Sequence, residues 1–358
     1  MKKILVIQQK MIGDVLVSSL LCEHIKLHLP ETEIHYVVNE NTVAVVEHNP
    51  FIDRIVVFKQ DYKNSKLKFL EFLQSISREE YDVVIDIYGK LESNLITLFS
   101  KAKIKITYGK WYSKSIYTHL VPLQPRKAGK CGITVEDRLG LLAPLIDTAL
   151  EKKREPTISL TQEEIDVAKL FLESQQIDMT RPILMLGILG SNGSKTYPLD
   201  YMAQVIDTIA DRTEGTLLFN YIPSQQSEAQ QLYDLCSEKT RAKIAFGTFA
   251  SSLRKFLGLL YHCRALIGNE GGAINMAKAL DIPTFSIYSP WINKMAWHTF
   301  AKDTNTAVHL NDYRPELIEG KPKKDLKNEI PELYEKFKPE LFIGALRSFL
   351  DEHVLTNK

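Results

Sequence analysis

The chain alternates short runs of apolar, β-branched residues with longer segments whose apolar residues recur at helical spacing. In the first half, these runs predict strands at residues 4–7, 34–38, 54–58, 82–87 and 104–107. The segments between them predict helices near residues 15–28, 64–78 and 134–148. Strands that alternate with helices in this way form parallel βαβ units, with the helices on the faces of the sheet.

The same alternation returns in the second half. It predicts strands at residues 183–186, 216–219, 243–246, 265–267 and 284–288, with helices near residues 161–177, 199–212, 225–238, 250–260 and 272–280. The polar segment EKKREP at residues 151–156 separates the two halves. We therefore predict an α/β protein with two doubly wound, Rossmann-like domains, residues 1–156 and 157–335, and a terminal helix within residues 336–358.

Composition supports two ordinary globular domains. The chain has 358 residues, more than one hydrophobic core usually serves. Its 44% hydrophobic and 25% charged residues exclude global disorder. Lys and Arg number 45 against 44 Asp and Glu, so no overall field would attract nucleic acid. Any anionic partner must therefore be bound by a local patch.

The cysteines and the apolar runs bear on the cellular compartment in which the protein works. The four cysteines lie far apart, which fits neither a zinc site nor a disulfide framework. No apolar stretch approaches the roughly 20 residues that a membrane span needs. We expect a cytoplasmic monomer that contacts a membrane peripherally, if at all.

The loop after the first predicted strand places Gly13 and Asp14 at the start of a helix. The Asp14 carboxylate could simply cap that helix, as Asp commonly does. Alternatively, it stands at the carboxyl edge of the sheet, where ligands of such sheets bind, and takes a proton from a substrate hydroxyl.

A second loop, GILGSNGSKTYP, follows the strand at residues 183–186 and is rich in small residues. Its glycines would let the backbone approach a ligand, Ser191 and Ser194 offer hydroxyls, and Lys195 supplies a positive charge. It suggests a phosphate cradle, although Ser194 replaces the glycine that precedes the lysine of a P-loop. A plain flexible surface loop is the alternative.

The third loop, GNEGGAIN, follows the strand at residues 265–267 and opens a helix at Gly271 and Gly272. Free backbone N–H groups and the helix dipole there can hold an anion such as a diphosphate. Glu270 would repel that anion unless it faces a sugar hydroxyl. The alternative is a tight turn capped by Asn269.

A stretch without acidic residues runs from residue 93 to 135. It contains eight basic residues: Lys101, Lys103, Lys105, Lys110, Lys114, Arg126, Lys127 and Lys130. Aromatic residues such as Trp111 and Tyr112 interleave with them, which suits contact with a polyanion of sugar or lipid character. An ordinary solvated surface is the alternative.

Three motifs in this order, GD after the first strand, SxxxK followed by YP, and NEGGxxxxAxALxIP, resemble the bacterial heptosyltransferases of glycosyltransferase family 9. The resemblance implies a GT-B fold: two Rossmann-like domains facing across a cleft, an acceptor-binding first domain, a donor-binding second domain, and a last helix that packs back on the first. It also implies an inverting, metal-independent transfer of heptose from ADP-heptose. The acceptor would be a lipopolysaccharide core or a related anionic glycolipid at the inner face of the cytoplasmic membrane.

By this resemblance Asp14 is the base and Lys195 contacts the donor phosphate. The remaining expected donor residues are Ser191, Ser194, Asn269, Glu270, Gly271, Gly272 and Asn275. For the acceptor we expect Gly13, Lys110, Lys114 and Lys130. No cofactor, metal ion or nucleic acid is expected.

The sequence departs from the family pattern around the donor sugar. Glu270 stands for the usual aspartate, Gly271 for a small hydroxyl residue and Asn275 for a histidine. These changes leave open a different nucleotide-sugar enzyme, such as a UDP-hexosamine transferase or an epimerase. They also leave open a degenerate, non-catalytic protein that binds sugar nucleotides.

Overall fold

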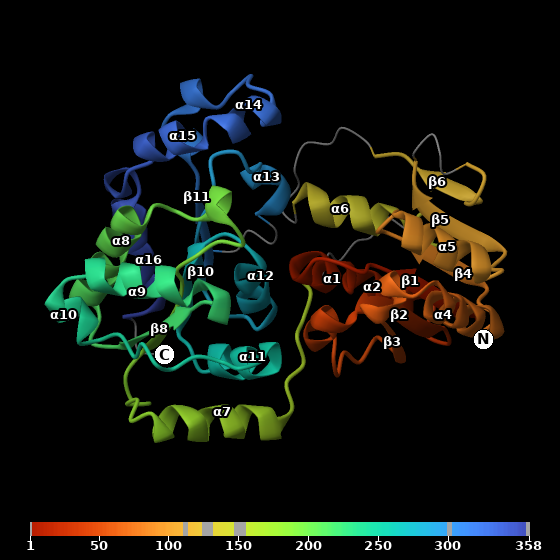
Figure 1. Ribbon diagram of the computed structural model, residues 1–358, viewed down its shortest axis with the longest axis horizontal. Coiled ribbons are helices and arrows are strands. Elements are labelled where there is room, and N and C mark those ends of the chain that lie inside the picture. Colours follow the sequence, from red (N-terminus) through yellow and green to blue (C-terminus); the bar gives the residue numbers. More distant parts are fainter. Residues whose placement is uncertain (1, 110–113, 124–131, 147–154, 299–302, 356–358) are drawn as a thin grey trace. The chain divides into compact units, whose positions relative to one another are not determined.

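The computed structural model describes residues 2–109, 114–123, 132–146, 155–298 and 303–355. The chain divides into two compact units, Met1–Ser159 and Leu160–Lys358. Each is an α/β domain around a parallel sheet, which confirms the predicted fold class (Figure 1). The division falls three residues after the boundary expected at residue 156.

The first domain is built on a six-stranded parallel sheet with strand order β3-β2-β1-β4-β5-β6. The strands are β1 (Lys3–Ile7), β2 (Glu33–Asn39), β3 (Arg54–Phe58), β4 (Val83–Asp86), β5 (Ile104–Tyr108) and β6 (His119–Val121). The strand order reverses direction between β1 and β4, so the loops after these strands border the crevice where doubly wound sheets bind ligands.

Helices cover both faces of this sheet. They are α1 (Ile12–Ser18), α2 (Leu20–His28), α3 (Asp61–Asn64), α4 (Lys66–Arg78), α5 (Leu91–Phe99) and α6 (Ile133–Gly140), with a short 3-10 helix η1 (Glu40–Val45). Alternate strand residues face opposite sides. Leu5 and Ile7 pack with Phe72 of α4 and Ile96 of α5, while the Tyr36 hydroxyl on the other face donates to the Val15 carbonyl of α1.

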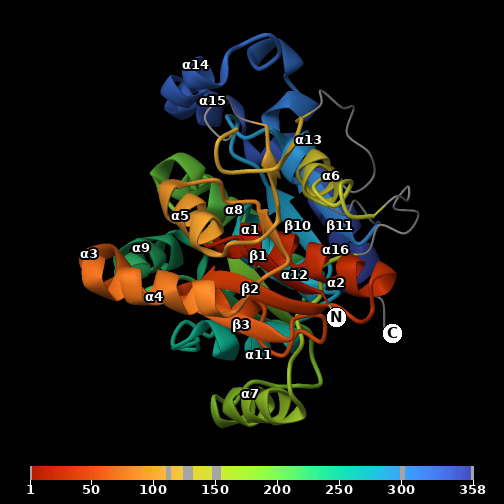
Figure 2. The same cartoon turned by 90° about the vertical axis from the view of Figure 1, so that its right-hand side faces the viewer.

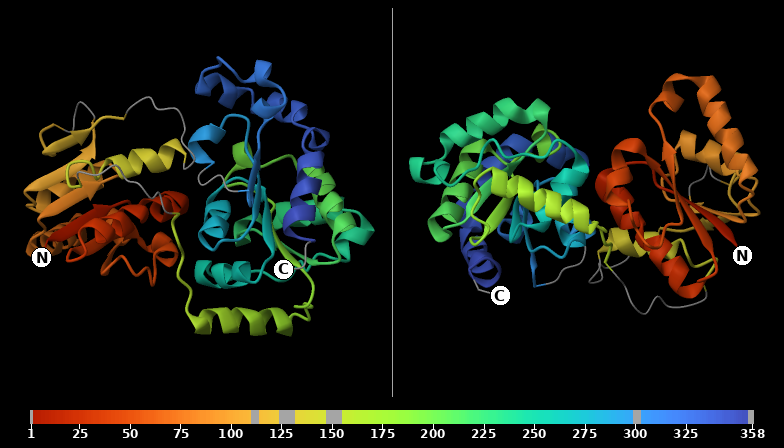
Figure 3. Two further views of the ribbon diagram at one scale, coloured as in Figure 1. Left: turned by 180° about the vertical axis from the view of Figure 1, so that it is seen from behind. Right: turned by 90° about the horizontal axis from the view of Figure 1, so that it is seen from below.

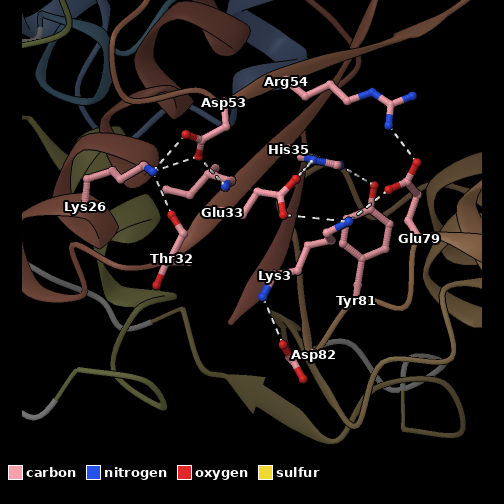
Figure 4. A network of polar contacts seen from close by, with 11 residues as sticks. Lys3, Lys26, Thr32, Glu33, His35, Asp53, Arg54, Glu79, Tyr81 and Asp82 are labelled. Atoms are coloured by element: carbon pink, nitrogen blue, oxygen red, sulfur yellow. Dashed lines mark hydrogen bonds and ion pairs between the residues drawn. The ribbon is translucent and has the colours of Figure 1, made fainter. Parts of the chain in front are cut away.

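Ion pairs tie the amino edge of this sheet together (Figure 4). Lys3 lies 3.0 Å from Glu79, which also accepts from Arg54 at 2.6 Å. Lys26 lies 2.7 Å from Asp53, whose other contact is the Ile34 N–H. These pairs join the starts of β1, β2 and β3 at the edge opposite the loops that carry chemistry.

The second domain has a five-stranded parallel sheet with strand order β11-β10-β9-β7-β8. Its strands are β7 (Ile183–Gly187), β8 (Thr216–Asn220), β9 (Ala265–Asn269), β10 (Thr284–Ile287) and β11 (Asn305–Val308). Here the order reverses between β7 and β9, so the loop after β7 and the turn after β9 border one crevice.

Helices also cover both faces of the second sheet (Figure 1). The longer ones are α7 (Gln162–Ser174), α8 (Leu199–Arg212), α9 (Gln226–Leu235), α11 (Leu253–Tyr261), α12 (Gly272–Ala279) and α16 (Ile343–His353). The shorter ones are α10 (Glu238–Arg241), α13 (Lys294–Trp297), α14 (Lys323–Asn328) and α15 (Ile330–Lys336). The 3-10 turns are η3 (Gly193–Lys195), η4 (Pro223–Gln225), η5 (Leu310–Asp312), η6 (Pro315–Leu317) and η7 (Pro339–Leu341).

The terminal helix α16 (Ile343–His353) packs against a different domain from the one expected. We expected residues 336–358 to return to the first domain, but α16 belongs to the second (Figures 2 and 3). Its residues Leu346, Phe349 and Leu350 are buried in one core with Phe285 of β10. The apolar side of the helix is therefore used within its own domain.

One strand prediction was wrong, and two strands were missed. Residues 243–246 form no strand, because only Ile244 bridges to Leu217 before the chain turns at Thr248. The short strands β6 and β11 were not predicted, since three or four residues are too few to show an alternating pattern. Both lie at sheet edges, where short strands are common.

Candidate active site

Asp14 lies in the first turn of α1, directly after the carboxyl end of β1. It does not cap the helix: Met11 is the cap residue and no side chain caps the N-terminus. Its carboxylate instead forms an ion pair with the guanidinium of Arg138 from α6. About a quarter of the Asp14 side chain stays exposed, so a substrate can reach it.

Arg138 is fixed before any substrate arrives. Its side chain is 8% exposed, and it donates to the Ser18 hydroxyl at 2.8 Å and the Thr134 carbonyl at 2.9 Å. A guanidinium held at these two points presents its remaining N–H groups in a set direction. The arginine therefore fixes the Asp14 carboxylate against helix α1.

Two tyrosines interact electrostatically with Asp14. Burial raises the pKa of Tyr108 to about 12, and burial raises the pKa of Tyr36 well above its usual value. Both phenols stay protonated at neutral pH. Neither phenol can therefore act as the base in these surroundings.

A cavity of about 410 Å³ opens beside the same loop of the first domain. It is lined by Lys10, Asn39, Glu40, Asn41, Phe58, Gln60 and Lys63, which follow the carboxyl ends of β1, β2 and β3. The neighbouring Lys10 lowers the pKa of the Lys63 ammonium, because each positive charge disfavours the other. Asn39 is buried, and its Oδ1 has no hydrogen-bond partner among the described residues. Paired lysines and amides suit an anionic ligand with hydroxyl groups.

In the second domain the loop after β7 folds tightly back on itself. A Cβ at Gly190 would lie 2.3 Å from the Lys195 carbonyl oxygen, so only glycine fits there. The Gly190 N–H donates to the Thr196 hydroxyl at 3.1 Å. Asn192 caps the η3 turn through the Ser194 N–H and accepts from the Ser194 hydroxyl at 2.7 Å. Hydrogen bonds within the loop thus define its conformation. Ser191 is exposed at its tip.

Asn269 at the end of β9 braces this loop. Its Oδ1 accepts from the Tyr197 N–H at 2.7 Å, and its Nδ2 donates to the Gly187 carbonyl at 3.0 Å. We expected Asn269 among the donor-binding residues. Both of its amide atoms form hydrogen bonds within the protein, so it also positions the loop after β7 against the turn after β9.

Lys195 and Glu270 meet at the crevice between β7 and β9. The Lys195 Nζ lies 2.9 Å from Glu270 Oε1, and Glu270 is 9% exposed. The turn continues through Gly271 into α12, whose first residue is Gly272. Asn275 follows on the first turn of α12 and is partly exposed. A cation, a carboxylate and a helix start are thus brought together from segments about 75 residues apart.

Aromatic rings gather next to this crevice, after β8. Tyr221 stacks near Phe246 and Phe249, with ring centroids 6.0 Å apart in each pair. Phe249 is 43% exposed. Gln225 joins this group to the Lys195 loop by donating to the Gly190 carbonyl at 2.9 Å. The exposed ring of Phe249 offers a flat apolar surface to a ring-shaped ligand.

Two of the four predicted acceptor residues lie within the described ranges. Gly13 lies in α1 next to Asp14, and Lys114 is exposed in the turn before β6. Lys110 and Lys130 lie outside the described residues. Within the described ranges, no group of three His, Cys, Asp or Glu side chains could hold a metal ion, and no helix has the length and apolarity to cross a membrane.

Sequence reasoning missed Arg138, Lys10 and Lys63. Arg138 did leave a signal, because it is the basic residue beside Leu139, Leu141 and Leu142 on an otherwise buried stretch. A buried arginine needs an acidic partner. The sequence could not say which one, since Asp14 lies 124 positions away.

The sequence is similar to those of known glycosyltransferases. The family model described as glycosyltransferase family 9 (heptosyltransferase) matches residues 69–322. Lipopolysaccharide heptosyltransferase 1 of Campylobacter coli is 21% identical over 294 residues, covering 80% of this chain and 83% of the relative.

Two solved structures share the fold. The glycosyl transferase family 9 protein from Veillonella parvula has a TM-score of 0.82 at 20% identity, covering 98% of both chains. The Escherichia coli ADP-heptose lipopolysaccharide heptosyltransferase II has a TM-score of 0.70 at 15% identity, covering 94% of this chain and 99% of the other. At these identities the likeness speaks for the fold alone.

Proposed function

This chain belongs to glycosyltransferase family 9, the heptosyltransferase family, and we propose that it transfers heptose from ADP-heptose to an anionic, lipopolysaccharide-type glycolipid. The family makes it a glycosyltransferase. The donor, the acceptor and the stereochemistry are our proposal. The observation that carries it is the Lys195–Glu270 pair at the start of α12. There the lysine would bind the diphosphate of the donor, and the carboxylate would accept hydrogen bonds from hydroxyl groups of its sugar.

The reaction proposed is a single displacement. The acceptor oxygen bonds to the anomeric carbon as the bond from that carbon to the diphosphate breaks, which inverts the centre. Asp14 takes the proton from the acceptor hydroxyl, and ADP leaves. General-base assistance of this kind contributes about 10² to 10⁴ in rate.

The second domain would stabilise the leaving diphosphate. Lys195 and the free N–H groups at Gly271 and Gly272 supply positive charge where negative charge develops, which is the part that a divalent metal plays in other transferases. Glu270 holds Lys195 and, in this proposal, accepts from hydroxyls of the donor sugar. Tyr221 and Phe249 would offer their rings to the nucleobase.

The first domain would hold the acceptor. We place an anionic group of the acceptor in the cavity between Lys10 and Lys63, with the amides of Asn39, Asn41 and Gln60 for its hydroxyls. The exposed Lys114 and the neighbouring acid-free stretch would face the membrane surface, so that the protein works peripherally on its cytoplasmic side.

The test is transfer measured with purified protein, ADP-heptose and a lipopolysaccharide precursor, with UDP-N-acetylglucosamine as the competing donor. We expect release of ADP, insensitivity to EDTA and an inverted product. Asp14→Ala should lose transfer but keep affinity for ADP. Lys195→Ala should weaken ADP binding by roughly 1.5 to 3 kcal/mol, the value of a charge-assisted contact.

Other outcomes would replace this proposal. Turnover of UDP-N-acetylglucosamine alone would identify a UDP-hexosamine enzyme, which the departures at Glu270, Gly271 and Asn275 make the main alternative. Binding of ADP-heptose without turnover in any acceptor would identify a non-catalytic member. Loss of activity with EDTA would refute the metal-independent mechanism.

A further inference from the structure

A second group of cations surrounds Trp291 in the loop after β10, close to Lys195. The Nζ atoms of Lys323, Lys327 and Lys195 lie 5.0, 5.4 and 5.8 Å from the centroid of the Trp291 ring. Lys323 and Lys327 are four residues apart on α14, so they share one face of that helix. Two segments far apart in sequence, η3 and α14, thus direct ammonium groups to one ring.

The ring at the centre of this group is held in place. The Trp291 indole N–H donates to the Ser194 carbonyl at 3.0 Å, and the Ser289 hydroxyl donates to the same oxygen at 2.7 Å. Ser194 directly precedes Lys195, so the ring and the lysine loop form one unit. The lysines of α14 therefore gather beside the proposed donor site and not at an unrelated surface.

The three lysines around Trp291 carry more positive charge than the carboxylate groups paired with them neutralise. Of the three lysines, Lys195 has a carboxylate partner, Glu270. Lys323 and Lys327 form no ion pair with any residue in the described parts of the chain, and both are exposed. Because the two lysines of α14 are exposed, their contacts with the ring are weak and do little against the mutual repulsion of neighbouring ammonium groups. An anion between them would remove that repulsion.

From this geometry we propose that Lys323 and Lys327, with Lys195 and over the face of Trp291, bind a phosphate group. The proposal extends the donor site and in that respect rests on the proposed function. Lys323 and Lys327 lie just beyond residues 69–322, the range that the family model matches. The phosphate has two possible sources, the diphosphate of the donor or a phosphate monoester on the acceptor.

The test uses the full chain with Lys323→Gln and Lys327→Gln combined. Glutamine keeps the length and the exposure of lysine but removes its charge. Lys324→Gln, on the same helix and also exposed, is the matched control. Calorimetric titration with inorganic pyrophosphate, ADP and mannose 6-phosphate measures binding without any need for turnover. Thermal melting checks that each variant is folded.

We expect the double variant to bind at least one of these anions about tenfold more weakly than wild type, as two exposed charge contacts allow, while Lys324→Gln binds like wild type. Weaker binding of pyrophosphate and ADP identifies the donor diphosphate as the source. Weaker binding of mannose 6-phosphate alone identifies a monoester on the acceptor. Equal affinities in all three proteins, or a wild type that binds none of the probes, would overturn the proposal. If wild type binds pyrophosphate but neither ADP nor ADP-heptose, the proposed function fails while the phosphate site stands.

Discussion

Arg138 gives the proposed base its position. The guanidinium joins Asp14 to Ser18 and Thr134, so one residue of α6 sets where the carboxylate points relative to α1. Misplacing a reacting group by about 1 Å can cost 10²-fold in rate. Arg138 itself has no role in proton transfer, since its guanidinium stays charged.

We therefore expect Arg138→Met to lower kcat by about 10²-fold, with little change in ADP affinity. Steady-state kinetics and ADP titration separate the two effects. Arg138→Lys should have a higher kcat than Arg138→Met, because lysine keeps the positive charge. Its kcat should stay below that of wild type, because lysine lacks the planar set of N–H donors of the guanidinium. Should ADP affinity fall in step with kcat, Arg138 acts on the fold as a whole and not on the position of Asp14.

At the scale of elements, the packing of α11 against α7 in the second domain depends on a glycine. A Cβ at Gly258 of α11 would lie 2.9 Å from the Ala168 Cβ of α7 and 3.2 Å from the Glu164 carbonyl. Carbon atoms do not approach so closely without movement of the backbone. The glycine thus lets α7 and α11 pack closely.

Gly258→Ala should destabilise the protein by about 1 to 3 kcal/mol, the usual cost of overpacking. Gly344→Ala is the matched control: Gly344 lies in α16 with nothing within 4 Å of an added Cβ, and alanine there should be neutral or stabilising. Urea unfolding measures both. An equal response of the two variants would show that α7 and α11 separate without cost.

The same two helices are joined by an ion pair. The Arg254 Nε donates to Glu164 at 2.6 Å, and Glu164 also accepts from the Thr161 N–H at the start of α7. The Arg254 guanidinium lowers the pKa of Glu164 to about 2. Because the folded state lowers this pKa, the pair stabilises the protein above the usual pKa of glutamate, and the stabilisation is lost as the pH falls toward 2.

Glu164→Gln removes this titration while keeping the side-chain shape. At pH 7 we expect the variant to be less stable by about 1 kcal/mol, given the partial exposure of the pair. The difference from wild type should shrink as the pH falls below about 4.5. Urea midpoints of both proteins at pH 7, 5 and 3 measure it. A difference that stays constant with pH would contradict the assigned ion pair.

For the whole molecule, a net charge of +1 means that membrane contact must come from a local patch. We expect binding to vesicles with anionic lipid, weakening as salt rises, because exposed charges are screened over about 8 to 10 Å at physiological ionic strength. Lys103→Glu with Lys114→Glu should reduce it, since both lysines are exposed in the acid-free stretch.

Lys66→Glu with Lys324→Glu changes the net charge equally and serves as control. Vesicle sedimentation at low and high salt compares the two. If both double variants lose binding alike, net charge governs adsorption and the patch has no special role.

Most of the architecture of this protein was predictable from its amino-acid sequence. Apolar runs identified nine of the eleven strands in the described ranges, because buried parallel strands show as continuous apolar segments. Glycines and polar residues at strand ends indicated the loops around Asp14, Lys195 and Glu270. Local patterns suffice here, since a parallel sheet brings the carboxyl ends of its strands to one edge.

The tertiary structure decided which side chains meet. The pairing of Asp14 with Arg138, the bracing role of Asn269 and the gathering of Lys323 and Lys327 around Trp291 join segments far apart in sequence. No local pattern encodes these pairs. The terminal helix shows the same limit, because its apolar periodicity predicted burial but not the partner. Only the packing of Phe349 against Phe285 places it in the second domain.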